Sequence, residues 1–437
     1  MTTGTLLASF TYDAFTAGSN YGKGRRTGMT WGSDSASWTY NVLGQMKDET
    51  RVISGVTYKT CNTYDAFGRV RTQKYPTTSN CTGETLNYSY NATGNLDSVI
   101  GTATYVSNMD YDEFGQVAAT YLNTGNIVSQ PCYAANNRRV VALRAYTGAL
   151  QSCTVANPTN SKLNLKYTYF NNGNVQQIVD QTRSETLNYT YDDLDRLWSV
   201  SGAYSQSFSY NTIGNFIAKA GVTHTYNANS PATGCVAGTA STKPHAAQQA
   251  GADTYVYDCN GSMTSRVESG TTYTQNFNAE NMMTSVVTGG QTTTFVYDGD
   301  DKLVKKINPN GTYTVYIGSI YEVEYSSGNV ATKKTSYYPG GAMRVDIVGG
   351  ANTLYYLLKD HLGSASTLLD TNGNIVANGE QRYYPFGEKR ITAADLKTDH
   401  LFTGQLSVGL GGIYSYGARF YSPRLGRFLS ADTIVPN

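Results

Sequence analysis

The stretch Tyr88-Ser89-Tyr90-Asn91-Ala92-Thr93-Gly94-Asn95-Leu96 decides the fold of this chain. Tyr88 and Tyr90 alternate with a polar residue, and this period of two projects both rings from one face of a β-strand. Asn91 is a preferred first residue of a type I turn, where its side chain caps the amides that follow. Gly94 tolerates the positive φ that closes a hairpin with a bulge, and the polar-apolar pair after it begins the return strand. The stretch therefore predicts one β-hairpin.

The same pattern recurs along the chain at intervals of roughly 20 residues, a spacing typical of repeat proteins. Because an isolated hairpin is marginal in water, the copies are expected to pair side by side in one long, twisted antiparallel sheet. Such a sheet exposes its edges and an aromatic face unless it winds on itself, so we expect an all-β spiral that forms a hollow shell or an open coil. The tyrosines at the centre of the repeats are Tyr40, Tyr64, Tyr90, Tyr111, Tyr169, Tyr191, Tyr210, Tyr257 and Tyr297, with variants at Tyr226 and Phe277.

Tyrosine outnumbers phenylalanine, 37 against 13. A dry core would favour phenylalanine and aliphatic residues, because a buried phenol needs a hydrogen-bond partner. We therefore expect the tyrosine rings to pack on one side of a curved wall and their hydroxyls to meet water on its inner surface.

The composition excludes several classes of protein. With 33 basic and 32 acidic residues the net charge is +1, so electrostatics gives no reason to expect a nucleic acid or an anionic membrane as partner. High aromatic and low charged content predict an ordered chain. No apolar stretch is long enough to cross a bilayer. The start, Met1-Thr2-Thr3-Gly4, is not a signal peptide, and the repeat is already under way at Tyr12, which favours a segment of a longer polypeptide.

The six cysteines form three local pairs with similar spacing. An even number in short intervals predicts disulfides, each closing one loop, and hence a secreted or extracellular location. Six buried free thiols in a cytosolic protein are the alternative. No cysteine or histidine cluster has zinc-ligand spacing, so no metal site is expected. The expected pairs are Cys61 with Cys81, Cys132 with Cys153, and Cys235 with Cys259.

From about Tyr313 the pattern changes to longer strands, which predicts a hairpin array over residues 1–312 and a separate domain over residues 313–437. The second region carries four motifs in order: Asp360-His361-Leu362-Gly363-Ser364, Tyr383-Tyr384-Pro385-Phe386-Gly387, Phe402-Thr403-Gly404-Gln405 and Gly426-Arg427-Phe428-Leu429-Ser430-Ala431-Asp432.

This series resembles the RHS repeat-associated core domain, and the upstream copies resemble the YD repeats of the same RHS/YD-repeat family. Teneurins, toxin-complex C components and polymorphic toxins are members of this family. The resemblance covers essentially the whole chain. It implies a β-strip that spirals into a hollow shell, often around a variable C-terminal toxin.

In several members of the family the core domain cuts its own chain with an aspartate acid–base pair. The matching position here is Asp432, with Arg419 and Arg427 nearby as supporting groups. This chain has Tyr421-Ser422-Pro423 and Asp432-Thr433-Ile434-Val435 where the family has Tyr-Asp-Pro and Asp-Pro-Ile-Gly. We therefore expect Asp432 to make a turn or a salt bridge and the chain not to be an enzyme, with self-cleavage as the alternative.

The remaining candidates are expected to be structural. None of His224, His245, His361 and His400 has a metal ligand at the right spacing, and His361 should form a structural hydrogen bond. The acidic run at residues 298–301 occupies a repeat turn, which predicts solvated carboxylates rather than a calcium site. The glycine-rich run at residues 22–28 lacks the spacing and the βαβ setting of a nucleotide loop. No cofactor is expected.

These observations favour a non-enzymatic, secreted or cell-surface RHS shell that carries a C-terminal toxin payload. Its partners would be that payload or neighbouring copies of itself. One alternative is an extracellular structural protein whose open strand ladders stack into filaments or a surface coat. Others are a module that binds glycans on exposed tyrosine faces and a self-cleaving aspartyl peptidase. The sequence does not identify the payload, the target or the oligomeric state.

Overall fold

The computed structural model describes residues 7–76, 80–226, 243–393 and 395–432. Within these ranges the chain consists of β-strands and turns, with two short 3-10 segments, η1 (Pro339–Gly341) and η2 (Phe402–Gly404), and no α-helix. No helix in the described ranges is long and apolar enough to span a membrane. The chain divides into two compact units.

Unit 1 consists of Met1–Ser129, Phe295–Tyr356 and Asp370–Gly373. Three strands, β13, β27 and β33, run across its limits into unit 2. The strands that lie in unit 1 or cross its limits are β1 (Ser9–Tyr12), β2 (Phe15–Thr16), β3 (Asn20–Tyr21), β4 (Arg26–Trp31), β5 (Asp34–Tyr40), β6 (Met46–Ile53), β7 (Val56–Tyr64), β8 (Val70–Lys74), β9 (Thr85–Tyr90), β10 (Leu96–Ile100), β11 (Thr104–Tyr111), β12 (Val117–Leu122), β13 (Ile127–Tyr133), β27 (Gln291–Tyr297), β28 (Leu303–Ile307), β29 (Tyr313–Ile317), β30 (Tyr321–Tyr325), β31 (Ala331–Tyr337), β32 (Ala342–Ile347) and β33 (Asn352–Lys359).

Unit 2 consists of Gln130–Thr294, Leu357–Leu369 and Asn374–Asn437. Its strands are β14 (Val140–Thr147), β15 (Ser161–Tyr169), β16 (Val175–Asp180), β17 (Glu185–Tyr191), β18 (Leu197–Gly202), β19 (Gln206–Tyr210), β20 (Phe216–Lys219), β21 (Val222–Tyr226), β22 (Ala247–Ala250), β23 (Asp253–Tyr257), β24 (Met263–Glu268), β25 (Thr271–Phe277), β26 (Met283–Thr288), β34 (Ala365–Leu369), β35 (Ile375–Glu380), β36 (Arg382–Tyr383), β37 (Lys389–Ile391), β38 (Leu406–Ser407), β39 (Tyr414–Ser415), β40 (Phe420–Ser422) and β41 (Arg427–Phe428).

One antiparallel sheet of 33 strands includes most of these elements. It starts at β1, passes to β4, and then follows the chain strand by strand to β35. The sheet is open, because β1 and β35 each pair with a single neighbour among the described residues. Strands β2–β3 and β36–β37 form separate hairpins, and β38–β41 form a sheet of four. The prediction of one long antiparallel sheet of hairpins is confirmed. The boundary expected between residues 312 and 313 stays a prediction.

The repeat turns have the chemistry that the sequence predicts. The amide of Gly44 donates to the carbonyl of Asn41, and the amide of Asn41 donates to the carbonyl of Gln45, both at 2.9 Å. Asn41 Oδ1 accepts from the amides two and four residues later, each at 3.0 Å. Gly44 has φ +78°, and the register of the ladder shifts between Thr39 and Tyr40. Each repeat is therefore a hairpin closed by a capped turn and a bulge.

Three repeats place another residue where the others have glycine. Asp195, Asn281 and Asp301 occupy it with φ of 59°, 58° and 57°. Short polar side chains tolerate this left-handed conformation because they can form hydrogen bonds to the nearby main chain. The repeat therefore requires a residue that accepts positive φ rather than glycine itself.

Seven of the nine repeat tyrosines bond their hydroxyls to main-chain carbonyls, whereas contact with water was expected. Tyr64, the last residue of β7, donates its hydroxyl to the carbonyl of Met46, the first residue of β6, at 2.6 Å. Tyr90, at the end of β9, donates to Val70, at the start of β8, at 2.7 Å. These bonds satisfy the half-buried phenols with main chain instead of water, and they join each strand end to the strand before it. Bonds of the same kind, at 2.6–2.9 Å, are made by Tyr40, Tyr111, Tyr169, Tyr191 and Tyr210.

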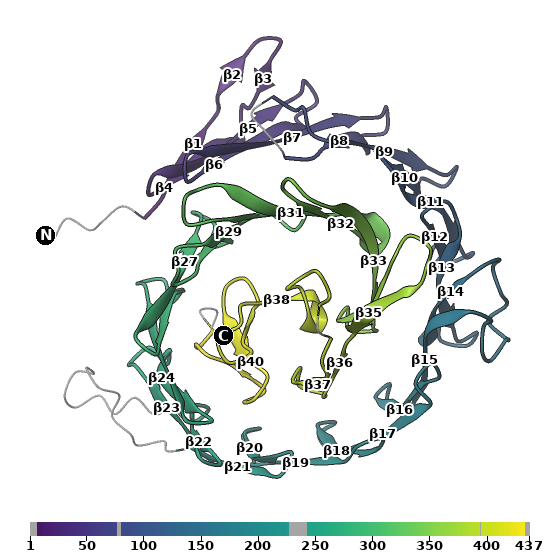
Figure 1. The fold of residues 1–437 in the computed structure, drawn as a ribbon, viewed down its shortest axis with the longest axis vertical. Coiled ribbons are helices and arrows are strands. Elements are labelled where there is room, and N and C mark those ends of the chain that lie inside the picture. The colour runs from purple at the N-terminus through teal and green to yellow at the C-terminus, as the bar shows by residue number, and fades with distance from the viewer. Residues whose placement is uncertain (1–6, 77–79, 227–242, 394, 433–437) are drawn as a thin grey trace, which may run out of the picture. The chain divides into compact units, whose positions relative to one another are not determined.

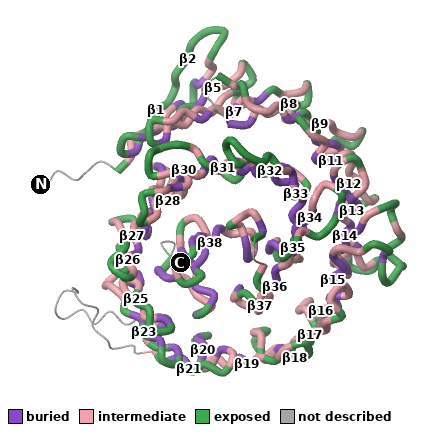
Figure 2. Tube along the Cα trace, viewed as in Figure 1, coloured by how far each residue is buried: buried purple, intermediate pink, exposed green. Residues whose placement is uncertain are grey.

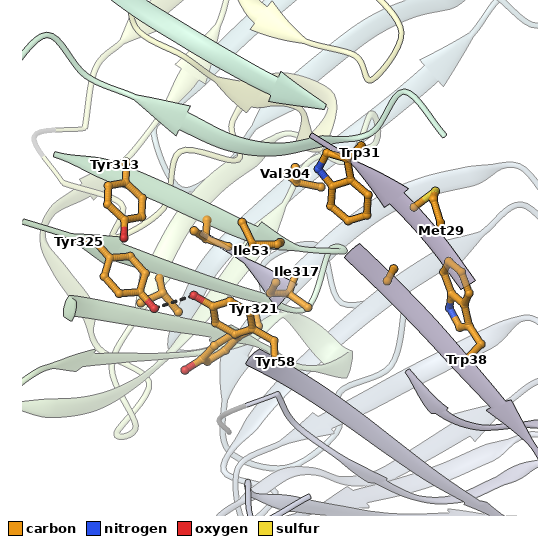
Figure 3. Close-up of a cluster of buried hydrophobic side chains, with 13 residues drawn as sticks. Met29, Trp31, Trp38, Ile53, Tyr58, Val304, Tyr313, Ile317, Tyr321 and Tyr325 are labelled. Atoms are coloured by element: carbon orange, nitrogen blue, oxygen red, sulfur yellow. Dashed lines mark hydrogen bonds between the residues drawn. The ribbon is translucent and has the colours of Figure 1, made fainter. Parts of the chain in front are cut away.

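In unit 1 the hairpins pack in two layers, with strands β29–β32 facing the layer of β4–β12 (Figure 1). A buried cluster joins the layers: Met29, Trp31 and Trp38 come from the early hairpins, and Ile317 and Tyr321 come from the later ones (Figure 3). The exposed residues gather at turns such as that between β2 and β3 (Figure 2). The core of unit 1 is therefore the space between two stretches of the same sheet.

One polar contact crosses this core. The hydroxyls of Tyr58 and Tyr325 lie 2.6 Å apart, within hydrogen-bond distance, although the residues are 267 positions apart (Figure 3). Burial, followed by the bond to Tyr325, raises the pKa of Tyr58 far above its usual value. Tyr58 is therefore neutral, and the two phenols satisfy each other inside the core.

Unit 2 also has two layers, in which residues 357–369, 374–393 and 395–432 pack against the hairpins of β14–β26 (Figure 1). The ring of Phe386 lies 5.2 Å from that of Phe208 and 5.1 Å from that of Phe216. Lys219, on the hairpin layer, forms an ion pair with Glu388 at 2.5 Å. The family motifs of the chain's last part thus supply the second layer of this unit.

Candidate functional site at the C-terminal segment

The three residues expected from the sequence to act together line one cavity of unit 2. This cavity has a volume of about 890 Å³, and Arg419, Arg427 and Asp432 contribute to its wall. The β19–β20 turn and the turn after β23 form another part of the wall, through residues such as Gly214 and Asn260. The fold therefore brings the predicted group together at a hollow of substantial size.

The two arginines have different partners. Arg419 Nη2 lies 2.9 Å from Asp432 Oδ2, and its guanidinium stacks 4.0 Å above the ring of Phe428. Arg427 Nη2 donates to Asn215 Oδ1 at 2.8 Å, and its Nη1 donates to the carbonyl of His245 at 3.3 Å. Arg419 therefore faces the aspartate, whereas Arg427 anchors the C-terminal segment to the hairpin layer.

The cavity wall is rich in cations. Arg196, Lys243, Arg419 and Arg427 line it, and among the described residues Asp432 is its only carboxylate. An aspartate acid–base pair needs a second carboxyl group close enough to share a proton. The described wall brings no such group to Asp432, so the geometry here is that of an ion pair.

His224 lies close to this region and is almost fully buried. Burial and the neighbouring cations Lys219 and Arg427 lower its pKa to about 4. The imidazole is therefore neutral at physiological pH. The sequence pattern did not predict this perturbed histidine, because its burial and the approach of Arg427, about 200 residues later, depend on the tertiary fold.

The other histidines make structural contacts. His245 Nδ1 lies 2.8 Å from Asn215 Oδ1, and His400 Nδ1 lies 3.1 Å from the carbonyl of Gly404. The ring of His361 lies 4.8 Å from that of Tyr167. Only the contact of His361 joins a motif segment to the hairpin layer, whereas those of His245 and His400 lie within the hairpin array and within the C-terminal segment.

Two of the three predicted cysteine pairs are disulfides, Cys61–Cys81 and Cys132–Cys153, with Cα separations of 5.9 and 5.8 Å. Cys235, of the third pair, lies outside the described residues. Among the described residues, one group has metal-ligand proximity, Asp48 with Cys61 and Cys81. Both of its sulfurs belong to a disulfide, so neither is available as a thiolate ligand.

The acidic turn at residues 298–301 is only partly solvated, because Asp300 is exposed but Asp298 is buried. Asp298 is buried and forms an ion pair with Arg51 at 2.9 Å, and Asp300 pairs with Arg26 at 2.6 Å. The expectation was wrong because the arginines come from β4 and β6, which lie far from this turn in the sequence.

Nothing in the sequence pattern predicted two ion pairs of unit 2. Arg382 Nη2 lies 2.8 Å from Asp180 Oδ2, and Arg390 Nη2 lies 2.5 Å from Glu185 Oε2. Each joins β16–β17 to the second layer across about 200 residues of sequence. They lie beside a second, smaller cavity in this unit.

The chain is similar to known proteins in both sequence and fold. The model of the Teneurin YD-shell family matches residues 136–435. Among curated proteins, the tRNA3(Ser)-specific nuclease WapA of Bacillus spizizenii is 29% identical over 185 residues, which is 40% of this chain and 8% of the nuclease.

The solved structures that resemble the chain are parts of much larger proteins. The TcdB2-TccC3-Cdc42 crystal structure has a TM-score of 0.75 and 18% identity, and covers 94% of this chain and 23% of its own. The structure of TcdB2-TccC3 without its hypervariable C-terminal region has a TM-score of 0.75 and 20% identity, with the same coverage. The Tc holotoxin pore of Photorhabdus luminescens has a TM-score of 0.73 and 18% identity, and covers 94% and 22%.

These structures share the fold with the chain, which spans less than a quarter of the length of each of these relatives. The capped repeat turns and the open antiparallel sheet agree with the family match. The chain belongs to the Teneurin YD-shell family and is a shell protein of the RHS/YD-repeat type.

Proposed function

We propose that this chain is the shell of a secreted or cell-surface carrier, and that its β-sheet encloses a polypeptide payload joined at the C-terminal side. The observation that carries the proposal is the family match over residues 136–435, together with a fold shared with TcdB2-TccC3. One of those structures is described as lacking a hypervariable C-terminal region. In this proposal residues 1–312 build the wall and residues 313–437 form the core region.

The physical features of the sheet support such a role. A wall that excludes solvent and proteases needs unbroken strand pairing, and the 33-stranded ladder leaves only β1 and β35 with a free edge among the described strands. The tyrosine-to-carbonyl bonds join neighbouring strands at the turn end of the hairpins. Enclosure needs no catalytic group, so the proposal assigns none to this chain.

The similarity to a nuclease is compatible with this role. The match spans 8% of that protein, so the proposal does not carry its nuclease activity over to this chain. The partner of the present chain would accordingly be its own payload.

A protease-protection assay tests the proposal. A folded reporter fused after Asn437 should resist a protease that degrades the same reporter fused before Met1, because only the former would lie within the wall. Both fusions should show the same circular dichroism. Equal degradation of the two reporters in folded fusions would contradict enclosure.

A further inference from the structure

A second cavity of unit 2 lies between the hairpin layer and the motif segments. Its volume is about 230 Å³, below the range of about 300–1,000 Å³ that is usual for drug-sized ligands. Strands β15–β18 supply one wall, and the segments around Asp360, Gln381 and Phe402 supply the other. The volume suits a ligand of monosaccharide size or several waters, at about 30 Å³ per water.

The charges at this cavity are already balanced by the protein. Arg382 pairs with Asp180 and also donates to the carbonyls of Ser366 and Gln381, each at 2.9 Å. Arg390 pairs with Glu185, and the pKa of this glutamate is lowered by Arg390 in spite of its burial. A charged ligand would therefore have to displace an existing ion pair.

Asp360 is also committed to the protein. Its Oδ1 accepts from the amide of Leu362 at 2.9 Å and from that of Ser364 at 2.8 Å. This carboxylate shapes the turn that carries His361, and the turn forms part of the cavity wall.

The buried polar atoms without a hydrogen-bond partner here are of two kinds: Arg382 Nη2 and Arg390 Nε belong to guanidinium groups already held in ion pairs, and the others are neutral. The hydroxyls of Tyr167 and Tyr383 are buried and have no side-chain partner among the described residues; that of Tyr167 lies against the main chain of His361. Tyr167 is only 3% exposed, and both residues line the cavity. Since a buried phenol without a partner is costly, each hydroxyl requires a donor or acceptor from whatever occupies the cavity.

Aromatic rings form much of the remaining wall. Tyr189, Tyr191 and Phe402 line the cavity along with the two unsatisfied tyrosines. Such rings pack well against the C–H faces of a sugar ring, and they hold it without a charge. The ligand must therefore offer hydrogen-bonding groups to the tyrosine hydroxyls and an apolar face to the aromatic rings.

We propose that this cavity binds a neutral, hydroxyl-rich ligand of monosaccharide size, such as a single pyranose unit. Its ring packs on the aromatic wall, and its hydroxyls bond the phenols of Tyr167 and Tyr383. The inference is independent of payload enclosure, because it rests on the wall of unit 2 alone.

The test uses the full chain and a panel of glucose, galactose, mannose and N-acetylglucosamine, with glucuronate and glucosamine as charged counterparts. Saturation-transfer difference NMR and calorimetry should detect at least one neutral sugar with a dissociation constant in the millimolar range, as expected for a ligand of this size. The charged counterparts should bind more weakly. Tyr167→Phe and Tyr383→Phe should each weaken binding about fivefold, and Tyr383→Phe should do so without lowering the melting temperature, because it deletes a hydroxyl that has no protein partner.

Tyr169→Phe is the matched control. Its hydroxyl bonds the carbonyl of Val140 and does not line the cavity, so this variant should lose stability and keep its affinity for the sugar. The proposal would be overturned if the folded wild-type chain bound no sugar of the panel, or if the double Tyr-to-Phe variant bound as tightly as the wild type. A crystal grown with the sugars that showed only water on both hydroxyls would overturn it too.

Discussion

At the scale of single residues, the tyrosines do more than pack their rings. Tyr64 and Tyr90 bond the first carbonyl of the preceding strand, and five further repeats make the same bond. A phenylalanine has the same ring but leaves that carbonyl without its donor. This difference explains why the repeat uses tyrosine on a face that is only half-buried.

Tyr64→Phe should lower the free energy of unfolding by about 1 kcal/mol, because it leaves the carbonyl of Met46 without this donor. The matched control is Tyr313→Phe in the same unit, since the buried hydroxyl of Tyr313 has no partner among the described residues. Urea denaturation should show a lower midpoint for the first variant and an unchanged or higher midpoint for the second. Equal shifts would show that the hydroxyl bond does not stabilise the repeat.

His224 should make stability depend on pH. Its pKa is about 4 in the folded chain against about 6.5 when unfolded, so between these values the unfolded chain binds more protons. Stability is therefore full above pH 6.5 and falls as the pH drops toward 4, by up to about 3 kcal/mol. His224→Gln removes this contribution. The urea midpoint should decrease less from pH 7.5 to pH 4.5 in this variant than in the wild type. Equal decreases in the two proteins would show that His224 does not cause the pH dependence.

Asp432 is expected to stay a partner of Arg419 rather than a catalyst, since the described cavity wall offers no second carboxylate. A chain extended beyond Asn437 should therefore remain intact on incubation, as followed by gel electrophoresis and mass spectrometry. A cut that disappears in Asp432→Asn and persists in Asp395→Asn would establish self-cleavage instead.

At the scale of the element, the hairpin is specified by its turn. The Asp or Asn side chain caps two amides, and the residue at the bulge takes positive φ. Glycine is the usual choice, and Asp195, Asn281 and Asp301 show that short polar residues also serve. The hairpin therefore tolerates substitution at the bulge position by any residue that can adopt the left-handed conformation.

Substitutions at Gly115 test this view. Its φ is +78°, and a Cβ placed there would meet no atom within 4 Å, so the cost of a side chain is conformational and not steric. Gly115→Val should lower stability by about 1–2 kcal/mol, whereas Gly115→Asn should cost clearly less. Thermal or urea unfolding of the two variants measures this difference. If both were equally destabilised, the bulge would demand glycine for another reason.

At the scale of the whole molecule, each unit is stabilised by packing between layers as well as by strand pairing. In a simple solenoid each repeat contacts only its neighbours, and a mutation acts locally. In unit 1, by contrast, the cluster around Trp31 and Trp38 includes Tyr321 (Figure 3) and also Val315, from nearly 300 residues later in the chain. Stability should therefore be shared between distant segments of that unit.

Val315→Ala, at a fully buried position of β29, should cost about 2 kcal/mol and should reduce hydrogen-exchange protection in β6 and β7 as well as in β28 and β30. The control is Val330→Ala, which changes a side chain that is 63% exposed and should leave the exchange pattern unchanged. Loss of protection confined to β28–β30 would mean that the layers are not energetically coupled.

The sequence alone predicted the hairpin, its turn and bulge, the continuous antiparallel sheet and the local disulfide pairs, because each depends on residues close together in the chain. It also singled out Arg419, Arg427 and Asp432, which the fold places around one cavity. It missed the partners of the tyrosine hydroxyls, since these are carbonyls whose position depends on the neighbouring strand.

Only the tertiary structure decided which distant groups meet. Tyr58 with Tyr325, Asp180 with Arg382, and Arg51 with Asp298 are each brought together across about 200 residues or more. No periodicity relates such positions, because the layer that a strand faces depends on the twist accumulated over many strands. The local chemistry therefore determined the repeating element, and the folding of the sheet on itself within each unit determined the cavities and their buried charges.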